Sequence, residues 1–165
     1  MLKFSLDNAK YPRVHAVDRY MAKGLDMIIT VIIALVFSVI SYYLGAILAV
    51  LYAFLHDSIK DGVSPGKMII GLKTIRYPNE ELKMNWKASI KRNFSFGLFA
   101  IFAVIPMMGW MLMFLVGIPL LVFEAYLIYN MESGYRLGDI LAGTRVVSVR
   151  ELNREREAGE PEDNE

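Results

Sequence analysis

Two long stretches without charge dominate this chain of 165 residues. Residues 27–55 contain no Asp, Glu, Lys or Arg, and Glu124 is the only charged residue among residues 94–129. A helix needs about 20 mainly apolar residues to cross a lipid bilayer. The two blocks have 29 and 36 residues, which is too long for one comfortable span each. Each block therefore predicts a helical hairpin.

The centre of each block has the residues of a turn at the membrane surface. Ser41, Tyr42, Tyr43 and Gly45 interrupt the first block, and the segment Pro-Met-Met-Gly-Trp at 106–110 interrupts the second. Tyr and Trp favour the membrane–water interface, and Pro and Gly favour turns. We predict four spans at about 19–41, 44–59, 90–107 and 110–131, with boundaries uncertain by about 2–4 residues. Two long, tilted helices are the alternative.

The basic residues favour four spans. The chain has 18 Lys and Arg, of which five lie at or before Lys23, eight lie in residues 60–92 and five follow from Arg136 onward. Basic residues close to a span stay on the cytoplasmic side. Only four spans, with both termini and the central loop inside, place all of them there, because both outer turns lack charge.

The predicted fold class is an all-α membrane protein, a four-helix transmembrane bundle of two hairpins with a small cytoplasmic sheet and an interfacial helix. We divide the chain into an N-terminal segment at 1–18, a membrane domain at 19–150 with a cytoplasmic loop at 60–89, and an acidic tail at 151–165. The tail has seven acidic residues and almost no apolar ones, a composition typical of disorder.

The central loop combines a turn, a short helix and a strand. Ser64 followed by Pro65 is typical of a helix N-cap and first turn, and Gly62, Gly66 and Gly71 surround them. Residues 67–72 predict an interfacial helix, with Lys67 reaching toward anionic lipid headgroups. Residues 72–77 alternate like a strand, residues 82–84 would return as a hairpin arm, and residues 144–150 would add a third strand.

We single out four of the charged residues in or near the expected spans as candidate site residues, namely Arg19, Asp26, Glu124 and Asp139. Charges in a membrane are costly and usually have a partner or a function. One reading is structural, in which Arg19 pairs with Asp26 or Asp139 and fastens the first span to the foot of the fourth. The other is a cation or proton site, in which Asp26 and Glu124 share a proton or Na⁺.

Three motifs, in order, resemble the RDD membrane-protein family: Arg19-x-x-Ala22-x-x-x-Asp26, then Gly62-x-Ser64-Pro65-Gly66-Lys67-x-x-x-Gly71-Leu72, then Gly138-Asp139-x-x-Ala142-Gly143-Thr144-x-Val146-Val147. The arginine and two aspartates that name the family match Arg19, Asp26 and Asp139. The resemblance implies a small bacterial protein of the cytoplasmic (inner) membrane, and transport, including cation–proton exchange, as its activity. Glu124 lies outside the family pattern.

Three functions follow as hypotheses. The first is a small transporter or cation–proton exchanger that uses intramembrane carboxylates, with a path between protomers of a homo-oligomer. The second is a membrane scaffold or regulator that binds a protein partner through its cytoplasmic face. The third, an enzyme acting on lipid, is disfavoured because no nucleophile or metal-ligand spacing is evident and cysteine is absent. We expect no cofactor, no metal and no nucleic-acid partner, with the lipid bilayer and anionic headgroups as the surroundings.

Overall fold

The computed structural model describes residues 12, 14–76, 83–130 and 135–159. Its first helical pair consists of α1 (Ala16–Ser38) and α2 (Tyr42–Leu55), which pack against each other. The chain reverses between them at residues 39–41. Gly45 permits this packing, because a Cβ there would lie 2.4 Å from the backbone oxygen of Ala34 in α1.

The second apolar block also folds back on itself. It contains α5 (Phe94–Val104), a turn at residues 105–107, and a helical run made of α6 (Met108–Leu112), the π-helical η1 (Met113–Gly117) and α7 (Ile118–Asn130). Pro119 stands two residues after the last residue of the π turn, Gly117. Proline has no N–H for the preceding turn and its ring crowds the carbonyl there, which explains the wider hydrogen-bonding pattern at this point.

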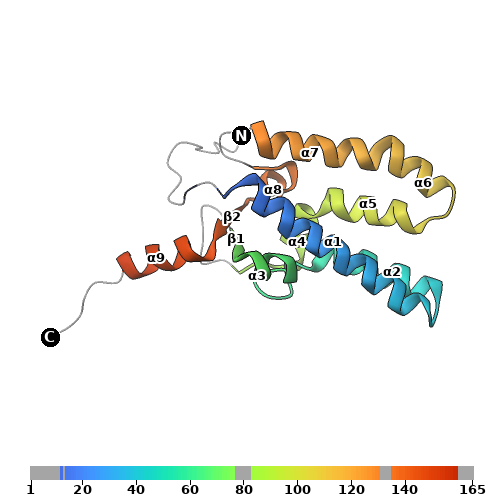
Figure 1. Ribbon diagram of the computed structural model, residues 1–165, viewed down its shortest axis with the longest axis horizontal. Helices are drawn as coiled ribbons and strands as arrows, with labels where there is room; N and C mark the ends of the chain where they lie inside the picture. The colour runs from blue at the N-terminus through green and yellow to red at the C-terminus, as the bar shows by residue number, and fades with distance from the viewer. Residues whose placement is uncertain (1–11, 13, 77–82, 131–134, 160–165) are drawn as a thin grey trace.

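Two of these helical segments are long and apolar enough to cross a membrane, namely α1 and the run Met108–Asn130, each with 23 residues. The other two apolar helices, α2 and α5, are shorter, with 14 and 11 residues. Figure 1 shows both chain reversals at one end of the molecule, and the sheet, α3, α8 and α9 at the other.

The distribution of side chains is the reverse of that in a water-soluble protein. Large apolar residues such as Leu35, Phe114 and Leu115 are 63%, 65% and 69% exposed, whereas Asp26, Asp57 and Asp139 are completely buried. Extended apolar surface on a protein marks contact with a partner or a membrane. The helices therefore present a lipid-compatible exterior around a charged interior.

The segment between the two helical pairs holds short elements. Ser64 accepts a hydrogen bond from the backbone N–H of Lys67 at the start of α3 (Pro65–Ile70), and Gly71 ends that helix with a φ of 76°. β1 (Leu72–Arg76) follows, and Asn85 then caps α4 (Trp86–Arg92) by accepting from the N–H of Ala88 at 2.9 Å. The expected N-cap at Ser64 and the strand that begins at Leu72 are both present.

The described part of the sheet has two strands rather than three. β1 pairs antiparallel with β2 (Thr144–Ser148), with Leu72 opposite Ser148 and Thr74 opposite Val146. Residues 83–85 form no strand, and residues 77–82 lie outside the described ones. The strand expected at 144–150 is thus present as β2, but it pairs directly with β1 and not through a hairpin arm at 82–84. Leu72 and Val146 of this sheet pack against Ala22 of α1.

The C-terminal elements are helical. α8 (Leu137–Ala142) precedes β2, and α9 (Val149–Gly159) follows it. The expectation of a disordered tail from residue 151 is wrong for the residues up to 159; residues 160–165 lie outside the described part. The physical reason is one apolar anchor: Leu152 is 5% exposed and packs with Ile75 and Val147 of the sheet, while the charged side of α9 faces outward.

Candidate functional site

Asp139 is the centre of one group of buried charges. It lies in the first turn of α8 and accepts from the guanidinium group of Arg19 in α1. Its Oδ1 also lies 3.2 Å from Nε of Arg92 and 3.4 Å from Nε of Arg136. Burial alone would raise the pKa of Asp139, but the three guanidinium groups outweigh it and hold the pKa well below its usual range. Asp139 is therefore an ionised carboxylate that ties α1, α4 and α8 together.

Asp57, just after α2, is the centre of a second group. Its Oδ1 accepts from the ammonium of Lys67, and its Oδ2 lies 3.3 Å from Nε of Arg92 and accepts from Nδ2 of Asn93 at 3.1 Å. Arg92 is 1% exposed and lies between Asp57 and Asp139, so it joins the two groups into one network. Breaking a buried pair by removing one partner leaves the other charge uncompensated.

Asp26 has different partners from those that the sequence suggested. Its Oδ2 accepts from the hydroxyl of Ser64 at 2.6 Å, and its Oδ1 accepts from the backbone N–H of Gly66 at 2.9 Å and from the Tyr52 hydroxyl at 3.3 Å. Arg19 pairs with Asp139 instead. Asp26 thus holds the first turn of α3 against α1.

The close approach of α3 to α1 depends on Gly66. A Cβ at this position would lie 2.2 Å from the backbone oxygen of Ala22 and 2.9 Å from Oδ1 of Asp26. These distances are shorter than any real Cβ contact, so a side chain here would push α3 away. The motif glycine therefore allows the Asp26 hydrogen bonds to form.

Lys67 was expected to extend toward lipid headgroups, but it points into the protein. Its side chain is 8% exposed, and its ammonium pairs with Asp57 and donates to the Thr74 hydroxyl at 2.9 Å. Burial and the neighbouring Arg92 lower its pKa to about 7, against the attraction of Asp57. The cause of the error is the helix rotation: α3 turns Met68 and Ile69, which are 56% and 67% exposed, outward and Lys67 inward.

His56 is a buried member of the network that sequence reasoning missed. Its Nδ1 lies 3.0 and 3.1 Å from the carbonyl oxygens of Tyr52 and Ala53, so this nitrogen carries the proton. Its Nε2 is 3.7 Å from the carboxylates of both Asp26 and Asp57. The imidazole of His56 therefore lies between the carboxylate of Asp26 and the carboxylate of Asp57.

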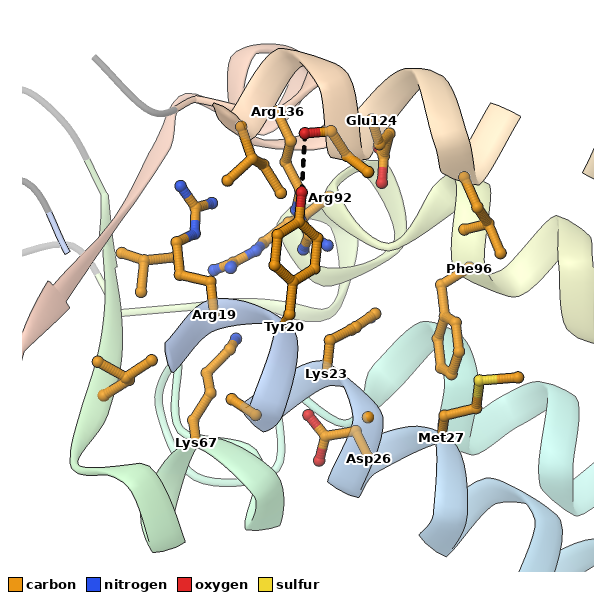
Figure 2. A pocket seen from close by; sticks show the side chains of 17 residues that line it. Arg19, Tyr20, Lys23, Asp26, Met27, Lys67, Arg92, Phe96, Glu124 and Arg136 are labelled. Carbon is orange, nitrogen blue, oxygen red and sulfur yellow. Dashed lines mark hydrogen bonds between the residues drawn. The ribbon is translucent and has the colours of Figure 1, made fainter. Parts of the chain in front are cut away.

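A cavity of about 250 Å³ lies between α1 and α7, and several members of the charged network line it. Figure 2 shows Glu124 pointing from α7 into the space between the two helices. The Tyr20 hydroxyl of α1 crosses this space to donate to the Ala125 carbonyl of α7 at 2.7 Å. The charged side chains that line the cavity are five basic and two acidic ones, namely Arg19, Lys23, Lys67, Arg92, Arg136, Asp26 and Glu124.

Glu124 differs from the other buried acids. It is 5% exposed, and its Oε1 accepts no hydrogen bond from any described residue. No carboxylate–base pair within 4.0 Å involves Glu124 in the described part of the chain, although Arg136 lies close enough to interact electrostatically. The structure thus places Asp26 and Glu124 on the walls of one cavity, but only Asp26 has a full set of donors.

Asp57, Arg92 and Arg136 were missed as site residues, and two of them carried a usable signal. Asp57 lies inside the expected span 44–59, and Arg92 inside the expected span 90–107. A charge within a span needs a partner, so both could have joined the candidate group. Among the described residues, no three His, Asp or Glu side chains are placed to hold a metal ion.

Comparison with known families gives a match over most of the chain. The RDD family matches residues 13–143, a range that includes Arg19, Asp26, the turn at Ser64 and Asp139. No curated protein and no solved structure matches the chain. Because the family match covers most of the sequence and contains the buried network, this chain belongs to the RDD family.

Proposed function

We propose that this protein is a small proton-coupled membrane transporter whose site is the cavity between α1 and α7, with Glu124 as the residue that takes up and releases the proton. The observation that carries the proposal is the unpartnered Oε1 of Glu124, an ionisable group 5% exposed in a cavity at the edge of an apolar helical layer. A carboxylate without fixed donors can change protonation without breaking a structural contact.

Asp26 has the opposite role in this proposal. Its two oxygens accept three hydrogen bonds, from Ser64, Gly66 and Tyr52, and protonation would disrupt them. In this proposal Asp26 stabilises the fold, and Glu124 takes up and releases the proton. This division departs from the hypothesis in which the two carboxylates share one ion.

The charge of the cavity favours an anion or a zwitterion over a free metal cation. Five basic side chains and two acidic ones line it. Asp57 and Asp139 pair with four of the basic ones from behind, so five basic groups still face four carboxylates, and like charges repel strongly where water is scarce. Cation–proton exchange remains the competing mechanism that the flux experiment must distinguish.

The proposed topology has four spans in a bacterial inner membrane, namely α1, α2, α5 and the run Met108–Asn130. Both termini and the central loop then lie in the cytoplasm. The positions of the basic residues support this topology, because it keeps every Lys and Arg on the cytoplasmic side. A reporter inserted after Ser41 or Met108 should be accessible only from outside; a cytosolic reporter there would refute the topology. A second copy of the chain would complete the path, because short helices enclose little volume.

Proteoliposomes loaded with a pH-sensitive dye test the transport proposal. We expect wild-type protein to move protons when an anionic solute such as inorganic phosphate, but not Na⁺ or K⁺ alone, is supplied on one side. Glu124→Gln should abolish this coupling while keeping the folded, monodisperse state, and Glu157→Gln, at an exposed position of α9, should not. Wild-type flux equal to that of empty liposomes with every solute would end the proposal.

A scaffold function is the second candidate, and α9 is the observation that favours it. This helix extends away from the body of the molecule (Figure 1) and exposes Asn153 and Arg154. A photo-cross-linker at Asn153 should then capture a specific protein in the native membrane. Cross-links only to other copies of this chain would count against a scaffold.

A further inference from the structure

Two opposite charges face the same cavity without meeting. Lys23 of α1 and Glu124 of α7 both line it, yet no described carboxylate lies within 4.0 Å of the Lys23 ammonium. Lys23 instead donates to Oδ1 of Asn93 at 3.1 Å and lies 3.9 Å from the centre of the Phe96 ring. A half-buried ammonium and a buried carboxylate on opposite walls, neither of them in an ion pair with a described residue, indicate a ligand that carries the complementary charges.

The basic wall can hold an anion with several oxygens. Asn93 Oδ1 accepts from Lys23 and, at 3.4 Å, from a terminal nitrogen of Arg136. The two donors therefore lie no more than 6.5 Å apart, the sum of 3.1 and 3.4 Å, so one phosphate group can contact both. Lysine and arginine together are typical phosphate ligands, and basic pockets between membrane helices bind lipid headgroups.

The acidic wall requires a donor at the other end of the ligand. Glu124 Oε1 is buried and accepts nothing, so a primary ammonium with N–H groups would satisfy it, whereas a fully methylated ammonium would not. The cavity, about 250 Å³, is smaller than the roughly 300–1,000 Å³ of pockets for drug-sized ligands. It therefore suits a small two-charge group.

We propose that the cavity binds a phosphoethanolamine group, with its phosphate at Lys23 and Arg136 and its ammonium at Glu124. This inference rests on the proposed site but not on transport through it. The lipid that carries this group, phosphatidylethanolamine, also fits the surroundings, because both helices expose apolar side chains. Ile28 of α1 and Val122 of α7 are 57% and 61% exposed, and each follows a residue that lines the cavity, Met27 or Leu121. Acyl chains could lie along them while the headgroup stays inside.

Lipid retention by the full chain in mild detergent tests the proposal without any gradient. Native mass spectrometry would compare phosphatidylethanolamine with phosphatidylglycerol, which lacks the amine, and with phosphatidylcholine, whose amine is fully methylated. We expect phosphatidylethanolamine to bind at least about tenfold more tightly than both, since one charge-assisted hydrogen bond contributes that factor or more. Equal retention of the three lipids would overturn the proposal, even if every variant failed to fold.

Two variants test which residue of the protein contacts each end of the ligand. Glu124→Gln should reduce phosphatidylethanolamine binding to the level of phosphatidylglycerol, and Lys23→Met should weaken both lipids alike. Glu157→Gln and Lys87→Met, at exposed positions, are the matched controls and should bind as the wild type does. An unchanged preference for phosphatidylethanolamine in folded Glu124→Gln would refute the ammonium subsite.

Free phosphoethanolamine distinguishes the two sources of the group. Its failure to displace the lipid assigns the site to the membrane lipid, and displacement at similar concentration assigns it to a soluble compound with the same group; both outcomes support the proposed chemistry. Failure of lipid binding with intact proton coupling would refute this inference alone. Intact binding without any flux would refute the transport function alone.

Discussion

The hydroxyl of Ser64 donates a hydrogen bond of 2.6 Å to the carboxylate of Asp26, 38 residues earlier in the chain. Both side chains are completely buried. The contact joins the loop between the two helical pairs to the long helix α1, and it explains why a serine and an aspartate occur in two separate motifs. Its strength can be measured directly.

Ser64→Ala should lower the stability of the folded protein by about 1–3 kcal/mol, because the buried Asp26 loses a hydrogen bond to its charged oxygen. The substitution also removes the N-cap of α3. Thermal unfolding in detergent, followed by tryptophan fluorescence, measures the change. Ser38→Ala is the control, since Ser38 is exposed and bonds only within α1. Equal losses for both variants would show that the contact contributes nothing.

Asp139→Asn and Arg19→Met should differ in effect, although the two residues form one ion pair. Removing Asp139 leaves Arg19, Arg92 and Arg136 without their shared anion, and we expect a loss of about 3–5 kcal/mol. Removing Arg19 leaves Asp139 with two guanidinium partners, so the loss should be smaller. Denaturation of both single variants and the double variant gives their coupling energy. A larger loss for Arg19→Met would contradict the arrangement.

Gly66→Ala should destabilise the protein by about 1–3 kcal/mol. The alanine methyl group would lie 2.2 Å from the backbone oxygen of Ala22 in α1, which cannot rotate away. Gly24→Ala provides the opposite case. A Cβ at Gly24 meets no atom within 4 Å, so alanine should raise helix stability by about 0.5–1 kcal/mol. Melting temperatures of the two variants, measured side by side, should therefore move in opposite directions.

Acid should weaken the fold through Asp139. Its folded pKa lies below the ordinary value of 3.8, so its stabilising effect is fully present above that value and is lost as the pH falls toward the folded pKa. Stability should then fall by up to about 1.4 kcal/mol per pH unit below 3.8 from this group. Unfolding curves at pH 5 and pH 3 check this. Asp139→Asn, already destabilised, should show a flatter dependence between these two pH values, and an identical slope would refute the assignment.

Several features could be read from the sequence because neighbouring residues produce them. The break in each apolar block, the N-cap at Ser64 and the strand after Gly71 depend on local backbone chemistry, and all occur where residues of the appropriate type stand. The burial of Asp26 and Glu124 was predictable as well, because a charged residue inside an apolar stretch usually has a partner or a function in the interior.

The partners of those charges could not be read in this way. Helices α2, α5 and α7 are apolar on nearly every side, so their sequences do not indicate which face turns inward. Helix rotation and tilt come from packing against neighbours. Only the packing of the helices therefore places Lys67 against Asp57 and Arg92 between Asp57 and Asp139. The same packing leaves Glu124 beside the cavity without an ion-pair partner among the described residues. The residue pattern determined which segments avoid water, and the tertiary contacts determined which charges share the interior, because a pairing between distant residues depends on how whole helices are oriented.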